Sequence, residues 1–442
     1  MRTSFFRIAG VSVALSAAVA CAASGEEQTE TTSLLEDGGL GPIADAEVPD
    51  AADAAVPTDV VTAPSTCSDA GWCLTPLPDP EMTMTDIWPV DGHAFGLVET
   101  AVVEWDATVG HWVYIDDGST RDLPNAVLAN IWAPSKDEVY FTALARSPKV
   151  AASAFSAYLF HGTRAAPPDQ GWTWTQIDFG CAANGAPQVW GTGPDDVYVW
   201  ACKTVHHLDR NGSADAGIEA DADAASPSRW VPEYVDDDLD PFNPLETLGI
   251  TGAGPDDVWF VGVRGALWIL GGGCTVVVHK SAAGYQRIVD GEAGLFTTDC
   301  TEKPGTTMLK GALTNVVGGG TLQSSGNGRA IGTLWTLEDE NDLVEIEATG
   351  AGGSVVTVAK RPGVKMGGAW AASNDPVWIL ADRNGVGGIV RGTNVWSDAG
   401  TYEISTLVRD GVPNVDALWR LRGSANALWA AGKGHAYRKT LP

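Results

Sequence analysis

The sequence predicts an all-β fold, a single β-propeller of seven four-stranded blades, with six or eight blades as alternatives. Three observations indicate it. From about Cys67 onward, short bursts of Trp, Val, Ile and Tyr alternate with Gly, Asp, Asn and Pro, and no long apolar stripe with helical period appears. One motif recurs along this region. The strand that follows the turn of this motif is apolar at every position, as expected of a sheet covered on both faces.

The N-terminus predicts export. Residues 1–20 read as a signal peptide, because a basic start precedes an apolar run that is too short to span a bilayer. The run ends in "AVAC", Ala18 to Cys21, which resembles a bacterial lipobox and predicts that Cys21 is lipidated. The same residues fit an A-x-A site of ordinary secretion, so export without a lipid stays open.

The segment 21–66 is predicted to be a lipidated Cys followed by a disordered acidic tether. Residues 22–66 contain ten Asp or Glu and no Lys, Arg or aromatic residue. Such a segment cannot bury enough apolar surface to offset its ordering entropy. We expect it to hold a propeller domain, residues 67–442, away from the membrane.

The clearest pair of repeats is "VWGTGPDDVYVWAC", Val189 to Cys202, and "GITGAGPDDVWFVGV", Gly249 to Val263. In each, a strand ends in small residues and a turn follows, in which Pro presets φ and Asp side chains can accept backbone N–H bonds. The next strand is apolar throughout. Thr204–Arg210 and Arg229–Val235 complete one predicted blade of four strands.

Weaker copies of the motif extend the repeat to both ends of the domain. The positions taken as equivalent are Trp88, Trp132, Trp190, Ile250, Val317, Trp370 and Trp419. Their spacing runs from 44 residues (Trp88 to Trp132) to 67 residues (Ile250 to Val317). This suits blades of roughly 40–50 residues with loops of varied length added.

The last copy leaves room for only one further strand, within Gly434–Pro442. The segment before the first copy, Gly71–Pro78, could supply the missing outer strand. Joining both ends in one blade would close the ring and remove exposed sheet edges.

From Asp86 to Tyr437 the chain resembles exported bacterial lipoproteins with Trp-rich "W-G-S/A-x-x-x-D-V-W-x-V-G" repeats. These repeats are distantly similar to those of the photosystem-assembly and sialidase-type propellers. The resemblance implies a propeller fold in an envelope lipoprotein and carries little information about function.

The remaining six cysteines suggest disulfides in an oxidising compartment. Six cysteines allow 15 pairings. Closeness in sequence favours three of them: Cys67–Cys73, Cys181–Cys202 and Cys274–Cys300.

The formal net charge of −29 disfavours nucleic-acid binding and attraction to an anionic membrane surface, since both require clustered Lys and Arg. The lipid anchor is therefore the predicted membrane contact. We expect a monomer on the outer membrane, at its periplasmic side or at the cell surface.

The paired acids Asp195-Asp196 and Asp256-Asp257 are interpreted as turn residues that recur with the blade; ion ligands or a carboxylate pair are the alternative. The acids of "VDDDLDP", Val235 to Pro241, alternate like the start of a calcium loop. Because Pro241 replaces the Gly that this loop needs at its sixth position, a solvated acidic loop is favoured.

His206 and His207 are neighbours on a predicted strand, so their side chains should point to opposite faces and not share a metal. Gly-rich segments at Gly271–His279 and Val316–Leu322 precede strands and lack the Lys of a phosphate-binding loop. No catalytic, metal-binding or cofactor-binding residue is therefore predicted.

These observations favour a binding or scaffold protein that presents loops and a central channel to an envelope protein or glycan. The alternative is a glycoside hydrolase or lyase, with carboxylates that converge on the axis. A channel lined by Gly, Ala, Thr and backbone would favour binding, and a buried carboxylate cluster with Arg or Tyr at the channel mouth would favour the enzyme.

Overall fold

The computed structural model describes residues 67–442, with gaps. The gaps are 91, 117, 119–122, 124–125, 152–153, 166–170, 184, 210–228, 239–242, 266–272, 295–298, 319–327, 337–340, 350–352, 360–361, 364, 374, 384–385 and 415. The signal peptide (1–20), the lipidation site Cys21 and the tether (21–66) predicted from the sequence lie outside the described residues.

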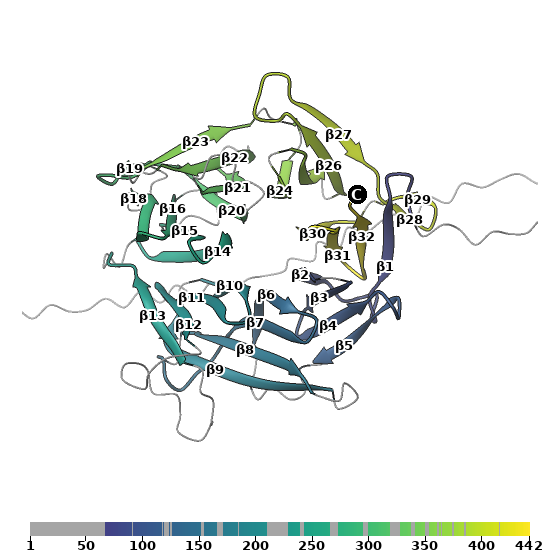
Figure 1. Ribbon diagram of the computed structural model, residues 1–442, viewed down its shortest axis with the longest axis horizontal. Coiled ribbons are helices and arrows are strands. Elements are labelled where there is room, and N and C mark those ends of the chain that lie inside the picture. Colours follow the sequence, from purple (N-terminus) through teal and green to yellow (C-terminus); the bar gives the residue numbers. More distant parts are fainter. Residues whose placement is uncertain are drawn as a thin grey trace, which may run out of the picture. The chain divides into compact units, whose positions relative to one another are not determined.

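The described residues form seven four-stranded antiparallel sheets, arranged as the blades of a β-propeller (Figure 1). Blade 1 consists of β2 (Met84–Val90), β3 (His93–Val98), β4 (Ala101–Asp106) and β5 (His111–Asp116). Blade 2 consists of β6 (Val127–Ser135), β7 (Glu138–Ala145), β8 (Ser156–Arg164) and β9 (Trp172–Ala182). Blade 3 consists of β10 (Gln188–Gly193), β11 (Asp196–Ala201), β12 (Thr204–Asp209) and β13 (Arg229–Val235). Blade 4 consists of β14 (Leu245–Gly254), β15 (Asp257–Arg264), β16 (Cys274–Ser281) and β17 (Gly284–Val289).

The remaining blades follow the same order. Blade 5 consists of β20 (Ala312–Gly318), β21 (Arg329–Trp335), β22 (Asn341–Ala348) and β23 (Ser354–Val358). Blade 6 consists of β24 (Lys365–Trp370), β25 (Val377–Arg383), β26 (Val386–Thr393) and β27 (Thr401–Ser405). Blade 7 consists of β30 (Leu418–Gly423), β31 (Ala427–Gly432), β32 (His435–Thr440) and β1 (Trp72–Pro76). Two small hairpins, β18 (Gly291–Ala293) with β19 (Cys300–Glu302) and β28 (Val408–Arg409) with β29 (Val412–Pro413), lie outside the blades.

The described part of the chain contains no helix, and so none that could cross a bilayer. The all-β, seven-bladed prediction is confirmed. The first strand of each blade lies nearest the axis, and the fourth lies at the rim (Figure 1).

The ring closes through both ends of the described chain. β1 pairs antiparallel with β32, from Trp72 opposite Lys439 to Pro76 opposite His435. The indole of Trp72 is fully buried and meets Trp378 of blade 6 edge-on, with ring centroids 6.2 Å apart. The predicted closure by an N-terminal outer strand is therefore confirmed.

Strand pairing corrects two of the equivalent positions. Trp190 lies opposite Tyr198, and the corresponding position of blade 4, opposite Trp259, is Thr251 and not Ile250. In blade 7 the equivalent position, opposite Trp429, is Arg422. Trp419 does not hold this position, and its side chain is 55% exposed. The sequence agrees with the pairing in blade 4, since Trp190 and Thr251 each lie four residues before the Pro of the turn.

One type of contact joins neighbouring blades near the axis. The Trp at the equivalent position of one innermost strand packs against a small residue of the next innermost strand, and this small residue comes directly after the equivalent position of that strand. A Cβ atom added to Gly191 would lie 2.9 Å from the Trp132 ring, and one added to Gly252 would lie 2.6 Å from the Trp190 ring. Trp370 lies against Gly423 in the same way. We call this contact the Trp–small joint. It explains why Gly recurs after the equivalent position.

We predict that Gly252→Ala lowers the free energy of unfolding by about 1–3 kcal/mol, because the added Cβ would lie 2.4 Å from the Asp257 carbonyl oxygen and 2.6 Å from the Trp190 ring. Gly249→Ala, on the same strand, is the matched control, since an added Cβ there meets no atom within 4 Å. Urea unfolding of the two variants measures the difference. Equal stabilities would contradict the Trp–small joint.

Candidate functional site

The turns that join the first and second strands of the blades lie on one face of the ring, which we call the turn face. At this face the innermost strands surround a cavity of about 330 Å³ at the axis. Its wall includes the rings of Trp88, Trp190 and Trp370, together with Thr251 and Arg422. Small residues and backbone fill most of the rest. The cavity is the mouth of the central channel.

Arg422 brings positive charge to this mouth. Its guanidinium lies 5.9 Å from the centroid of the Trp88 ring. Behind it, the fully buried carboxylate of Asp86 lies 3.7 Å from Arg422 Nε and 3.1 Å from Arg420 Nε. Asp86 also accepts hydrogen bonds from the Asn130 side chain (3.1 Å) and the Ile131 amide (3.2 Å). Two guanidinium groups therefore share one carboxylate.

The electrostatics of this group favour an anion. Burial lowers the pKa of Arg422, and the neighbouring charge of Arg420 lowers it further, while Asp86 opposes both effects. Arginine remains protonated in proteins despite such a shift. Arg422 therefore places a positive charge, paired with the buried Asp86, at the border of a cavity with aromatic walls.

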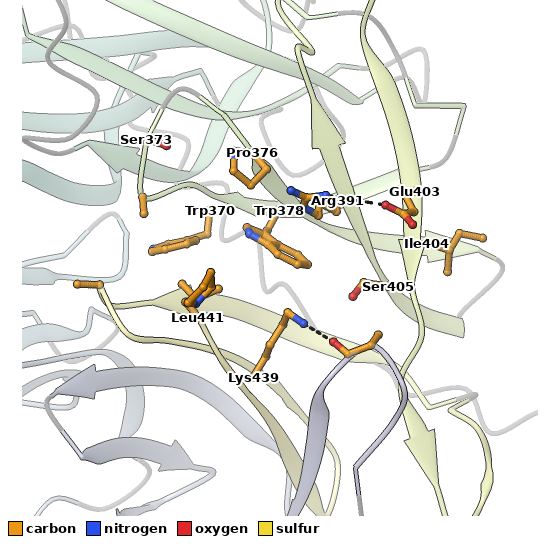
Figure 2. Close-up of a pocket in the computed structure, with 14 residues that line it drawn as sticks. Trp370, Ser373, Pro376, Trp378, Arg391, Glu403, Ile404, Ser405, Lys439 and Leu441 are labelled. Atoms are coloured by element: carbon orange, nitrogen blue, oxygen red, sulfur yellow. Dashed lines mark hydrogen bonds and ion pairs between the residues drawn. The ribbon is translucent and has the colours of Figure 1, made fainter.

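A second, larger cavity of about 510 Å³ lies on the same face, between blades 6 and 7 (Figure 2). We call it the closure groove, because one of its walls belongs to the blade that closes the ring. Trp370 and Trp378 line it from blade 6, and Lys439 and Leu441 line it from blade 7. Trp370 also lines the channel mouth, so the two cavities share a wall.

Two cations lie in the closure groove. The ammonium of Lys439 lies 5.6 Å from the centroid of the Trp378 ring and donates a hydrogen bond to the Ala70 carbonyl. Burial lowers the pKa of Lys439, and the charge of Arg391 adds to this effect. Arg391 Nη1 lies 3.9 Å from Glu403 Oε2, beyond hydrogen-bond distance.

The repeat singled out three of these residues, Trp88, Trp190 and Trp370, as equivalent positions, but none of the charged ones. Arg422 stands at the position that carries Trp in most copies, and that departure from the repeat is the signal that could have found it. Asp86 and Arg420 give no such signal, because Asn130 and Gln188 make their position polar in other blades as well. The cations of the closure groove give no such signal, because they lie on outer strands where charge is ordinary.

The recurring aspartates, by contrast, join the second and third strands within a blade. The first of each pair, Asp195 or Asp256, lies in the turn, and the second begins a strand. Asp196 Oδ1 lies 2.8 Å from His207 Nε2, and Asp257 Oδ1 lies 2.8 Å from His279 Nε2.

Blade 2 repeats the arrangement with a glutamate. Glu138 Oε1 lies 2.9 Å from His161 Nε2, and the imidazole stacks on Tyr140 with a centroid distance of 4.2 Å. His207 stacks on Tyr198 in blade 3 in the same way, at 4.4 Å. An acid, a histidine and an aromatic ring thus recur as one structural unit in blades 2, 3 and 4.

His206 and His207 point to opposite faces of blade 3, as the sequence predicted. His206 contacts Phe179 of blade 2, and its burial lowers its pKa to about 4. His207 faces blade 4. Burial lowers its pKa, but hydrogen bonds to Asp196 and Glu233, together with their charges, outweigh this and raise the pKa to about 9.

These opposite shifts predict two pH windows. His207, whose pKa is raised in the folded state, contributes its full stabilisation of the fold below its ordinary pKa of 6.5. This contribution is lost as the pH rises to about 9. His206, whose pKa is lowered in the folded state, stabilises the fold above pH 6.5. This stabilisation is lost as the pH falls from 6.5 to about 4. We expect His207→Gln to destabilise the fold by on the order of 1 kcal/mol more at pH 6 than at pH 9.5, since partial exposure screens the pair.

His206→Gln is the matched control for this prediction. Its cost should shrink as the pH falls from 7 to 4 and stay constant between pH 7 and 9.5. Urea unfolding at each pH measures both variants against the wild type. The assignment is wrong if the cost of His207→Gln does not change between pH 6 and pH 9.5.

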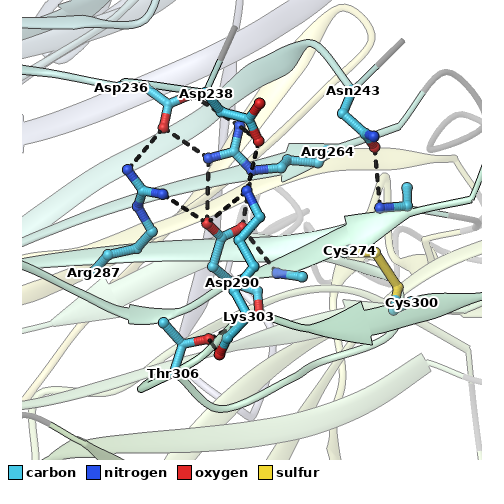
Figure 3. Close-up of polar contacts among 12 residues, drawn as sticks. Asp236, Asp238, Asn243, Arg264, Cys274, Arg287, Asp290, Cys300, Lys303 and Thr306 are labelled. Carbon is cyan, nitrogen blue, oxygen red and sulfur yellow. Dashed lines mark hydrogen bonds and ion pairs between the residues drawn. A yellow bond between two sulfur atoms is a disulfide. The ribbon is translucent and has the colours of Figure 1, made fainter. Parts of the chain in front are cut away.

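The segment after Val235 corrects another expectation (Figure 3). Instead of a solvated acidic loop, Asp236 is fully buried and accepts two hydrogen bonds from the equally buried Arg264, at 2.7 and 2.9 Å. Asp290 accepts a third from Arg264 at 2.9 Å. Asp240 lies outside the described residues. The sequence repeat does not predict this ion pair, because Arg264 is 28 residues away from Asp236.

Arg287 and Lys303 complete this buried ion-pair network, which joins the end of blade 3 to blade 4 (Figure 3). Pairing and hydrogen bonding of this kind account for the burial of the three titratable side chains Asp236, Arg264 and Asp290. Across the described ranges, no group of three or more His, Cys, Asp or Glu is placed to hold a metal ion.

The six cysteines of the described region form the three disulfides that closeness in sequence favours: Cys67–Cys73, Cys181–Cys202 and Cys274–Cys300. Disulfides persist in oxidising compartments. They therefore indicate an extracytoplasmic location.

Distant structural neighbours of the chain are also β-propellers. A streptogramin B lyase is 12% identical with a TM-score of 0.49, and the match covers 84% of this chain and 97% of that one. The β-propeller domain of Vanderwaltozyma polyspora Nup133 is 7% identical with a TM-score of 0.43, covering 84% of this chain and 98% of that one. No family model and no curated protein matches the chain. At these identities the likeness bears on the fold alone.

Proposed function

We propose that this protein is a binding protein of the bacterial envelope, and that its ligand occupies the turn face at the channel mouth and the closure groove. One observation carries the proposal: tryptophan rings, small residues and cations line both cavities, which meet at Trp370. Concave sites with aromatic walls and a few polar groups are typical of ligand binding.

The lining supports binding over the alternative of a glycoside hydrolase or lyase. A glycosidase needs two carboxyl groups about 5–9.5 Å apart across the scissile bond. The residues that line the two cavities include a single carboxylate, Glu403, which is 78% exposed and lies beside Arg391. Asp86 is fully buried behind Arg420 and Arg422.

We further propose that Cys21 carries a lipid and anchors the protein, as a monomer, to the outer membrane. The "AVAC" sequence and the acidic segment that follows it support this anchoring. The disulfides support the oxidising location that it requires. The partner would be an envelope glycan or protein.

We predict that Trp378→Ala lowers the capture of envelope material by the immobilised mature protein at least tenfold, because the ring forms a wall of the closure groove. Trp419→Ala is the matched control, since Trp419 is 55% exposed and lies at the start of β30, away from the turn face. Captured protein and carbohydrate would be quantified after washing, and thermal melts would establish that both variants are folded. Equal capture by the two folded variants would contradict the proposed site.

A further inference from the structure

The closure groove concentrates positive charge in a strongly acidic protein. The chain has a formal net charge of −29, yet two of the groove's side chains, Arg391 and Lys439, are cationic and one, Glu403, is anionic. Glu403 is the most exposed of the three, and its distance of 3.9 Å from Arg391 is too long for a hydrogen bond. Solvent therefore screens its charge more than that of the cations.

The two tryptophans and the two cations lie close together. Figure 2 shows Trp370, Trp378 and Arg391 in succession along the groove, with Lys439 on the opposite wall. Trp370 and Trp378 are almost fully buried, with 7% and 6% exposure, so each presents only part of its ring to the cavity. Lys439 donates one hydrogen bond, to Ala70, and an ammonium has three donors.

Hydroxyl groups add polar contacts to the same walls. Ser405 accepts a hydrogen bond from the buried Trp72 indole at 2.9 Å, which fixes this hydroxyl at the groove. Ser373 lies on the turn between β24 and β25 and donates to the Asp375 carbonyl at 2.8 Å. The groove thus combines the exposed edges of two indoles with charged donors and hydroxyls.

We propose that the closure groove binds an acidic oligosaccharide, with sugar carboxylates held by Arg391 and Lys439 and sugar rings against the ring edges that Trp370 and Trp378 leave exposed. The proposal rests on the binding function proposed above and specifies the ligand class. Guanidinium groups bind carboxylates through two parallel hydrogen bonds, and an ammonium binds them as a point charge.

The size of the groove favours a chain of rings over a single ring. Its volume is about 510 Å³, and only the Trp370 ring separates it from the channel mouth of about 330 Å³, where Arg422 supplies another positive charge. A repeating acidic sugar can present a ring and a carboxylate to each tryptophan and cation in turn. A small aromatic acid would use only one such pair.

The test is calorimetric titration of the full mature protein with a tetrasaccharide of galacturonic acid and with the neutral galactose tetrasaccharide. We expect the acidic probe to bind at least tenfold more tightly and its affinity to fall with added salt. Arg391→Gln and Lys439→Gln should each weaken it about tenfold. Lys136→Gln, an equal charge change at a 58%-exposed lysine of blade 2, should change it less than twofold.

Three outcomes would overturn the proposal. The first is equal affinity for the two probes. The second is a folded Arg391→Gln variant that binds the acidic probe as well as Lys136→Gln does. The third is no binding of either probe while capture of envelope material still depends on Trp378, which would leave the proposed function in place. If capture does not depend on Trp378, the proposed function itself fails.

Discussion

The structure depends on the packing of one indole against one small residue where the innermost strands of blades 1, 2, 3 and 6 meet the next blade. Trp132 against Gly191, Trp190 against Gly252 and Trp370 against Gly423 share this geometry. Trp88 approaches blade 2 in the same position, with its Nε1 donating to the Ala133 carbonyl at 3.1 Å. A large ring fits there only because the facing position carries little or no side chain. The joint therefore fixes how closely consecutive blades approach.

The candidate site lies where a blade lacks this tryptophan, and where the Trp–small joint closes only the inner part of the interface between two blades. Blade 4 carries Thr251 and blade 7 carries Arg422 in place of the tryptophan, so at these points the mouth gains a hydroxyl and a charge. Between blades 6 and 7 the inner joint is present, but the outer part of the interface stays open as the closure groove. Blades 2 to 4 also share a second recurring unit, which consists of an acid, a histidine and an aromatic ring.

The repeat predicted most of the fold, because it reports a periodic constraint that every blade shares. The blade number, the closure by Trp72–Pro76 and the disulfide pairs all follow from spacing. The sequence does contain the correct register of blade 4, because Trp190 and Thr251 each lie four residues before the Pro of the G-P-D-D turn, so Ile250 was placed one residue too early. Blade 7 lacks this turn sequence, and only its strand pairing identifies Arg422 in place of Trp419. Burial of Asp236 was missed because its partner Arg264 lies on another blade. The site was missed for the same reason: Asp86 and Arg422 are far apart in the sequence and adjacent only in the closed ring.

The central claim is that the ligand binds where Trp370 separates the channel mouth from the closure groove. The most direct measurement is fluorine NMR of the protein labelled with 5-fluorotryptophan, with resonances assigned from single Trp substitutions. On addition of captured envelope ligand, we expect the resonances of Trp370 and Trp378 to shift and that of Trp419 to stay unchanged. A shift of the Trp419 resonance with Trp370 and Trp378 unaffected would contradict the claim.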